Sequence, residues 1–153
     1  MDRTALAACA VKRAKELGIR SFVFSAKDFS SKAEYEACIV DELIAAEVEL
    51  VCLAGYMRIV GKTLLEAYAG RIINLHPSLL PSFKGARAIE QALEYGTKVF
   101  GATIHYVEES LDGGKIIAQQ AIAYEGSDIE ELTAKIHAIE HPLYIKAIKK
   151  LLN

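Results

Sequence analysis

The length and composition of the sequence are those of one globular domain. It has 153 residues, of which 52% are hydrophobic and 25% are charged, and its formal net charge is −2. These values exclude a disordered tail protein and a strongly basic nucleic-acid-binding surface, and no apolar run reaches the roughly 18 residues of a membrane-spanning helix. We therefore expect a single domain over residues 1–153, in the cytoplasm, with neither nucleic acid nor a membrane as a partner.

Helices and strands alternate along the first half of the chain. The expected elements are, in order, a helix from the candidate N-cap Asp2 to the stop at Gly18, a short strand at 21–25 (SFVFS), a helix over 31–46 capped by Ser30 or Ser31, and a strand at 49–54 (ELVCLA). The last of these is a nearly continuous apolar run. Such runs are typical of strands that are buried on both faces.

The second half continues the alternation and ends in a long helix. The expected elements are a helix over 61–69, a strand at 71–76 (RIINLH), a helix over 86–95 that stops at Gly96, strands at 99–107 and 115–124, and a helix from the N-cap Ser127 towards Leu152. Pro142 should kink or divide this last helix. The alternation predicts an α/β fold with a largely parallel sheet, to which the late strand pair adds an antiparallel or mixed edge.

Two polar side chains lie at the end of the predicted strand 71–76. Asn74 and His76 are two residues apart, so they project to the same side of a strand, and Pro77 ends the strand directly after them. Open α/β sheets bind ligands at the carboxyl ends of their strands. An amide donor beside an imidazole suits polarisation of a carbonyl and stabilisation of its oxyanion. The alternative is a hydrogen-bonded core or loop histidine without a catalytic role.

Asp112 is a candidate partner for His76. It lies in the turn LDGG (111–114), and an Asp-Gly turn on its own is most often only a turn. A carboxylate close to His76 would favour the protonated imidazole, which could act as an acid. Because the two residues are far apart in the sequence, spacing alone leaves their distance open.

The sequence predicts neither a metal site nor a disulfide. Cys9, Cys38 and Cys52 are an odd number without CxxC spacing, which is typical of small buried side chains in a reducing compartment. His137 and His141 have the i, i+4 spacing of a metal pair on a helix, but no HExxH pattern or further ligand completes a site. No nucleophile elbow, dinucleotide-binding motif or Walker A loop is present in the sequence.

Several motifs together resemble one family along essentially the whole chain. They are, in order, LAGYMRIV (53–60), INLHPSLLP (73–81), GATIHYV (101–107), LDGG (111–114), IAQQ (117–120) and EH (140–141). NLHPSLLP with a later LDGG is specific to folate-dependent formyltransferases, and the complete set most resembles the phosphoribosylglycinamide formyltransferase family of purine synthesis. The resemblance implies a single formyltransferase domain with a Rossmann-type, mostly parallel sheet flanked by helices.

The resemblance also implies a reaction and a catalytic set. Such enzymes transfer a formyl group from 10-formyltetrahydrofolate to the amine of 5′-phosphoribosylglycinamide, both small-molecule substrates, without a metal. Asn74, His76 and Asp112 match the family's catalytic residues. In this interpretation Asn74 and protonated His76 stabilise the tetrahedral oxyanion, while Asp112 holds the imidazolium and helps to relay protons to the leaving folate nitrogen.

The same resemblance implies binding residues for both substrates. Glu140 would contact the ribonucleotide, and His105 would support that part of the site. Lys32 stands where the family commonly carries an arginine, which keeps the charge but loses the planar guanidinium. The residues implied to contact the folate are Lys32, Met57, Arg58, Ile59, Val60, Asn74, Glu108, Glu109, Ser110, Leu111 and Asp112.

The sequence departs from the family pattern at its start. Members of the family open with a strand and a Ser-Gly-x-Gly-Ser-Asn loop that holds the ribonucleotide phosphate, and the present sequence begins after both. Two hypotheses follow: an active formyltransferase, or a truncated, catalytically weak or inactive folate-binding remnant. Methionyl-tRNA formyltransferases and formyltetrahydrofolate hydrolases share the Asn, His and Asp elements but carry a further domain. A homo-oligomer is expected in either case.

Overall fold

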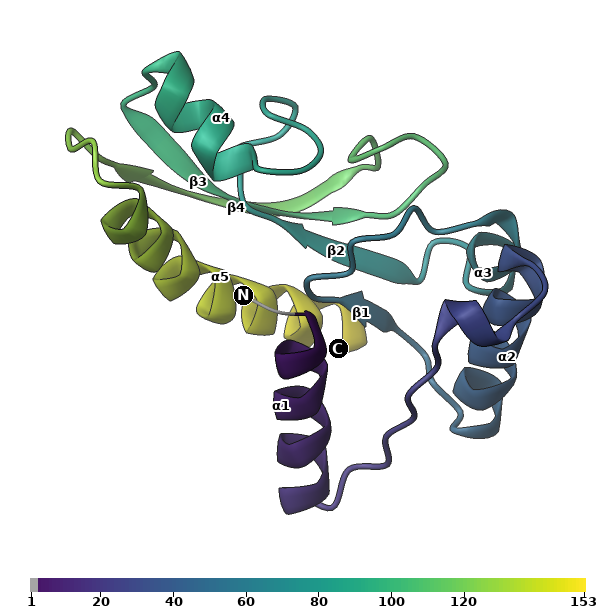
Figure 1. The fold of residues 1–153 in the computed structure, drawn as a ribbon. Coiled ribbons are helices and arrows are strands. Elements are labelled where there is room, and N and C mark those ends of the chain that lie inside the picture. The colour runs from purple at the N-terminus through teal and green to yellow at the C-terminus, as the bar shows by residue number, and fades with distance from the viewer. Residues whose placement is uncertain (1–2) are drawn as a thin grey trace.

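The computed structural model describes the backbone of residues 3–153 as a sheet with helices around it (Figure 1). The predicted N-cap Asp2 lies outside the described residues. The elements are α1 (Arg3–Glu16), a 3-10 turn (Ala26–Asp28), α2 (Lys32–Ala45), β1 (Val51–Leu53), α3 (Lys62–Ala67), β2 (Ile72–His76), α4 (Ala88–Tyr95), β3 (Val99–Tyr106), β4 (Ile116–Ala123) and α5 (Ile129–Leu152). None of the helices in the described part has the length and apolar character that a bilayer span requires.

The four strands form one mixed sheet in the order β1-β2-β3-β4. β1 pairs with β2 in parallel, whereas the pairings of β2 with β3 and of β3 with β4 are antiparallel. The predicted α/β class and the antiparallel late strand pair are thus confirmed, and the parallel part of the sheet is smaller than predicted. The β2–β3 register sets Asn74 opposite His105 and His76 opposite Thr103, so that polar residues of both strands meet.

Helix α5 provides much of the core by running along the sheet (Figure 1). Its residues Leu143, Tyr144 and Ala147 form a buried cluster with side chains of β2 and β3. The Tyr144 hydroxyl also donates to the carbonyl oxygens of Leu53 (2.8 Å) and Ile73 (3.2 Å), which ties α5 to β1 and β2. Further towards its start, α5 buries Leu132 and Ile136 in a second cluster that includes residues of α4 and β3.

The segment 21–25 and the strand β1 differ from the prediction. Residues 21–25 form no strand, and Phe22 and Val23 are 45% and 72% exposed. A strand needs a neighbour that exchanges backbone hydrogen bonds with it, and no segment among residues 3–153 pairs with this one. β1 was expected to be buried on both faces, but Cys52 is exposed on one face, whereas Val51 and Leu53 are half-buried on the other.

The predicted burial of the three cysteines is wrong. Cys9 and Cys52 are exposed and Cys38 is half-buried, so none of the three is a fully buried core side chain. Cys9 lies on α1, which projects away from the sheet in Figure 1, and Cys52 lies on the edge strand β1. Burial of these residues would require elements packed over α1 and β1.

Helix α5 begins one residue later than predicted and is not divided. Asp128 is the N-cap in place of Ser127, because its Oδ1 accepts from the amides of Glu130 (2.8 Å) and Glu131 (3.2 Å). Pro142 lies inside one continuous helix. The burial of apolar side chains beyond Pro142 offsets the backbone hydrogen bond that proline cannot donate.

The first prediction concerns the core under α5. Ile136 is 1% exposed, and Ile145 on the same helix is 55% exposed. Ile136→Ala should lower the free energy of unfolding by about 2–5 kcal/mol, because it leaves a cavity among packed side chains. Ile145→Ala should change it by less than about 0.5 kcal/mol. Urea denaturation of both variants measures the difference, and equal midpoints would contradict this description of the core.

Candidate active site

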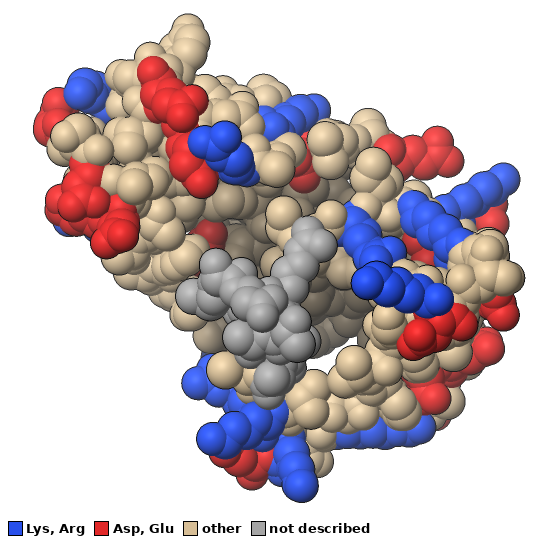
Figure 2. Space-filling view, viewed as in Figure 1, with Lys and Arg blue, Asp and Glu red and all other residues tan. Residues whose placement is uncertain are grey.

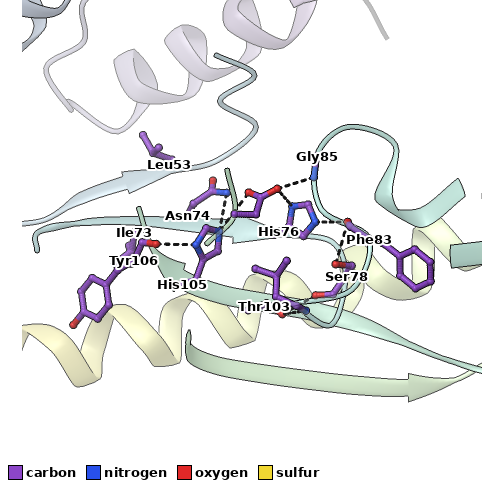
Figure 3. Close-up of polar contacts among 12 residues, drawn as sticks. Leu53, Ile73, Asn74, His76, Ser78, Phe83, Gly85, Thr103, His105 and Tyr106 are labelled. Atoms are coloured by element: carbon purple, nitrogen blue, oxygen red, sulfur yellow. Dashed lines mark hydrogen bonds and ion pairs between the residues drawn. The ribbon is translucent and has the colours of Figure 1, made fainter. Parts of the chain in front are cut away.

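His76 is held at the end of β2 by contacts on both of its ring nitrogens (Figure 3). Its Nε2 lies 2.8 Å from the carbonyl oxygen of Phe83, and its Nδ1 lies 3.5 Å from Oδ2 of Asp112. A carbonyl oxygen only accepts, so Nε2 carries a proton and donates to Phe83. The second nitrogen, Nδ1, faces the carboxylate of Asp112. His76 is only 4% exposed, which strengthens both contacts.

Asp112 joins three parts of the chain. Its Oδ2 accepts a hydrogen bond from the amide of Gly85 (2.7 Å), and its Oδ1 lies 3.7 Å from Nε2 of His105. The backbone of Asp112 is left-handed (φ 46°), a conformation that aspartate tolerates better than most residues. The structure therefore brings Asp112 to His76, a contact that the sequence left open.

His105 orients the amide of Asn74. Its Nδ1 lies 2.8 Å from the carbonyl oxygen of Tyr106, so Nδ1 carries the proton of a neutral ring. Burial is the main cause that lowers the pKa of His105, which favours this neutral form. The Nε2 atom then accepts from Nδ2 of Asn74 at 3.3 Å. The Asn74 amide has a second hydrogen, and that hydrogen can donate to a substrate oxygen.

Glu140 approaches the same site from α5. Its side chain is 10% exposed, and its Oε2 lies 3.9 Å from Nε2 of His137. Burial raises the pKa of Glu140, while the nearby charges of His137, His141 and His76 partly oppose this shift. Among the described residues, the ion-pair partner of Glu140 is His137 on the same helix.

The residues expected to contact the folate lie in two places. A cavity of about 240 Å³ is lined by Lys32, Tyr35, Glu36, Tyr56, Arg58 and Ile59. The Arg58 guanidinium lies 5.5 Å from the centre of the Tyr35 ring, and Lys32 Nζ lies 3.9 Å from Oε1 of the buried Glu36. Met57 is 64% exposed beside this cavity, whereas Val60 is 6% exposed and packs into the core with Leu64.

The second group is the loop 108–112. Glu108, Glu109, Ser110 and Leu111 are exposed, and the Gly113 amide donates to the carbonyl oxygen of Ser110 to close a turn. Asp112 is the member of this loop that contacts His76 and His105. The other four residues are available to a bound ligand but touch none of the catalytic candidates through a hydrogen bond or ion pair in the described structure.

No group of three or more His, Cys, Asp or Glu side chains among the described residues could hold a metal ion. Charged groups are instead spread over the surface, and Figure 2 shows Lys and Arg interspersed with Asp and Glu on the face drawn. The candidate residues Asn74, His76, Asp112, His105 and Glu140 provide an amide donor, imidazoles and carboxylates.

Comparison with known proteins identifies the family. The family described as Formyl transferase matches residues 5–148, which is most of the chain. This chain belongs to the formyl transferase family. The catalytic candidates all lie within the matched residues, as do both groups of expected folate contacts.

Relatives of the family are similar over nearly the whole chain. The phosphoribosylglycinamide formyltransferase of Bacillus subtilis is 49% identical over 144 residues, which are 94% of this chain and 74% of that protein. The trifunctional purine biosynthetic protein adenosine-3 of Drosophila melanogaster is 43% identical over 94% of this chain, which covers 11% of that longer protein.

A solved structure of a phosphoribosylglycinamide formyltransferase has the same fold. The crystal structure of the enzyme from Streptococcus pneumoniae TIGR4 is 46% identical, with a TM-score of 0.90. The match covers 94% of this chain and 81% of that one. The arrangement of strands and helices around Asn74 and His76 is therefore that of the formyl transferase family.

Sequence reasoning missed three contributors to the site. Phe83 and Gly85 act through backbone atoms, which any residue carries, so no side-chain pattern could have revealed them. Glu36 is 1% exposed and accepts from the amide of Gly61 at 2.6 Å, which holds the start of α3 beside the cavity. The i, i+4 spacing of Lys32 and Glu36 is a signal that could have paired them.

The second prediction concerns Glu140 and pH. A carboxyl group whose pKa is raised on folding holds its proton more tightly in the folded protein. Its contribution to stability is complete below the ordinary glutamate pKa of about 4.3 and is lost as the pH rises through the raised value. Glu140→Gln should therefore raise the Tm relative to the parent protein at pH 7 to 8, and this gain should disappear near pH 4.

A matched control for this experiment is Glu125→Gln, since the Glu125 side chain is 80% exposed. Its effect on Tm should be small at every pH. Thermal unfolding of the three proteins across the pH range provides the measurement. A Tm difference between Glu140→Gln and the parent that does not change with pH would refute the assignment.

Proposed function

We propose that this chain is a formyltransferase domain, over residues 1–153, that transfers a formyl group from 10-formyltetrahydrofolate to the amine of 5′-phosphoribosylglycinamide in purine biosynthesis. One observation carries the proposal: Asn74, His76 and Asp112 form a connected group at the end of β2. The identity of 49% to a protein named for this activity supports it. Both substrates are small molecules, and a homo-oligomer stays a prediction.

The group suits formyl transfer because each side chain has a distinct chemical role. The substrate amine attacks the formyl carbon, forms a C–N bond and leaves a tetrahedral oxyanion. The second amide hydrogen of Asn74 and the Nδ1 hydrogen of His76 stabilise that oxyanion. Nε2 already donates to Phe83, whereas the 3.5 Å between Nδ1 and Oδ2 of Asp112 is longer than an ordinary hydrogen bond, so Asp112 and the oxyanion can share the Nδ1 hydrogen. When the intermediate collapses, the bond from carbon to the folate N10 breaks.

Two protons must move during this reaction. The amine loses one proton after it forms the new bond, and the folate nitrogen gains one as it leaves. Asp112 lies 3.5 Å from Nδ1 of His76, so the pair can pass a proton between acceptor and leaving group. Glu140, which is buried and approaches the site from α5, is the carboxylate that attracts and positions the acceptor amine.

The cavity between α2 and the segment 56–59 is the proposed site for the glutamate end of the donor. The glutamate carboxylates of the folate are anions, and Lys32 and Arg58 provide cations at the wall of the cavity. Arg58 is supported by the Tyr35 ring, which limits its movement. Met57 and Ile59 are exposed next to these cations and offer apolar surface to the aromatic part of the donor. The loop 108–111 provides the remaining contacts.

The alternative, an inactive folate-binding remnant, is not favoured. The set Asn74, His76 and Asp112 is complete, and contacts of His76 and His105 with Asp112 and of His105 with Asn74 connect it, which favours an active site. The matched relatives are phosphoribosylglycinamide formyltransferases, which also argues against the tRNA-directed and hydrolytic members of the wider group.

The third prediction tests the catalytic set directly. The protein should transfer the formyl group of 10-formyltetrahydrofolate, or of its dideaza analogue, to 5′-phosphoribosylglycinamide. His76→Ala should lower kcat by about 10²–10⁴-fold, the usual contribution of a positioned acid. Asp112→Asn should lower kcat within the same range, because the amide keeps an oxygen for the Gly85 hydrogen bond but loses the charge.

Donor binding serves as the control in this experiment. His76→Ala should bind the folate with an affinity close to that of the parent protein, as measured by fluorescence titration, because His76 is not among the expected folate contacts. Turnover that persists in His76→Ala would exclude the proposed chemistry. Donor binding without turnover in the parent protein would support the remnant instead.

The fourth prediction concerns the donor cavity. Lys32→Ala should raise the Kd for the folate about tenfold, because a hydrogen bond to a charged group contributes about 1.5–3 kcal/mol. Lys62→Ala is the matched control, since Lys62 is an exposed lysine that also pairs with a glutamate four residues later. Isothermal titration of the donor measures both. Equal affinities would remove Lys32 from the donor site.

A further inference from the structure

A second group of hydrogen bonds lies beneath the loop 77–85 that follows β2 (Figure 3). Thr103 on β3 is 0% exposed, and its hydroxyl donates to the carbonyl oxygen of Ser78 at 2.6 Å. The same hydroxyl accepts from the Leu80 amide at 3.1 Å. Gln119 on β4 donates to Thr103 Oγ1 and to the carbonyl oxygen of Leu80, both at 2.9 Å. The hydroxyl of Thr103 thus uses its donor and both of its acceptor positions.

The loop held in this way supplies two backbone atoms to the catalytic group. The Phe83 carbonyl accepts from Nε2 of His76 at 2.8 Å, and the Gly85 amide donates to Asp112 at 2.7 Å. Within the loop, the Ser78 hydroxyl donates to the carbonyl oxygen of Ser82 at 2.6 Å. A shift of the loop would therefore move the partners of both His76 and Asp112.

Apolar packing alone does not fix this loop. A cavity of about 130 Å³ lies against it and is lined by the loop residues Pro77, Ser78, Leu79, Ser82 and Phe83, together with residues of α4, β3 and the segment between them. Phe83 also has a left-handed backbone (φ 53°), which is unfavourable for a residue with a bulky side chain. Such a conformation persists only where the surrounding structure holds it.

We propose that Thr103 and Gln119 are positioning residues for formyl transfer. They act through the loop 77–85, whose Phe83 carbonyl and Gly85 amide fix the orientation of His76 and Asp112. This inference rests on the proposed function, but the hydrogen bonds themselves can be tested without it. Because a displacement of about 1 Å at a reacting group costs much of its effect on rate, loss of either side chain should lower kcat and leave the KM for the donor nearly unchanged.

The fifth prediction compares two neighbouring glutamines. Gln119 and Gln120 are consecutive exposed residues of β4, so their side chains point to opposite faces, and Gln120 contributes no side-chain hydrogen bond to this group. Gln119→Met removes two donors and should lower kcat about tenfold. Gln120→Met makes the same chemical change on the other face and should leave kcat and KM as they are.

Thr103 provides a rescue test. Thr103→Val keeps the shape of the side chain but leaves Ser78, Leu80 and Gln119 without their shared partner, and kcat should fall about tenfold or more. Thr103→Ser restores the hydroxyl and should recover most of the lost kcat, although it removes a buried methyl group. A purely structural role would make the serine variant no better than the valine variant.

Hydrogen exchange gives a readout that does not depend on activity. The backbone amides of residues 77–85 should exchange faster in Gln119→Met than in Gln120→Met or the parent protein. This comparison tests whether Gln119 holds the loop 77–85 even if the parent shows no formyl transfer, a result that would contradict the proposed function but not the hold on the loop. If Thr103→Val does not fold, the exposed position of Gln119 still permits the test.

The results that would overturn the proposal are definite. In an active parent, equal kcat values for Gln119→Met and Gln120→Met would do so, as would a fall in kcat of the same size in both Thr103 variants. Unchanged exchange of the loop amides in Gln119→Met would also refute it. A rise in KM with unchanged kcat would instead assign Gln119 to substrate binding.

Discussion

The contact between the His76 imidazole and the Asp112 carboxylate is the interaction on which the site depends. It joins the end of β2 to a turn that lies 36 positions later in the chain, and it also brings His105 and, through the Gly85 amide, the loop 77–85 to the same place. A buried carboxylate with several donors around it loses less from desolvation than an isolated one. The turn 111–114 and the loop 77–85 therefore stabilise each other's position.

The geometry of the sheet determines which side chains of β2 and β3 reach the candidate site. Alternation along β2 places Asn74 and His76 on one face, while Ile73 and Leu75 on the other face pack against the cluster that includes residues of α5. The β2–β3 register then sets His105 beside Asn74 and Thr103 beside His76. Two residues of β3 thus support different residues of β2. His105 orients the amide of Asn74, and Thr103 contacts the loop that orients His76. A shift of one residue in this register would send all four side chains to the wrong partners.

Local patterns predicted much of this arrangement, and contacts between distant segments account for what they missed. The cap Ser31, the stop at Gly96 and the pair Asn74 and His76 depend on neighbours in the sequence, and the structure has them as expected. By contrast, the segment 21–25 has the composition of a strand but no pairing partner among the described residues. Composition reports the preference of a segment, whereas strand formation also requires a second segment beside it.

The difference between local patterns and contacts of distant segments also applies to the candidate catalytic residues. Asn74 and His76 were predicted because strand geometry alone places them together, but the approach of Asp112 depends on how two loops fold against each other. Phe83 and Gly85 were beyond sequence reasoning because they contribute backbone atoms. The family resemblance implied that Asp112 is a partner of His76, but it did not say which groups hold Asp112 in place. The structure shows that the amide of Gly85 donates a hydrogen bond to its carboxylate.

Burial has the same effect on two ionisable groups near the site, His105 and Glu140. Desolvation lowers the pKa of His105 and raises the pKa of Glu140, so it favours the neutral form of each. A neutral His105 can accept from Asn74. His76 and Asp112 instead contact each other, with Nδ1 of His76 3.5 Å from Oδ2 of Asp112. The His76–Asp112 contact thus lies at the centre of the candidate site, and His105 orients Asn74 beside it.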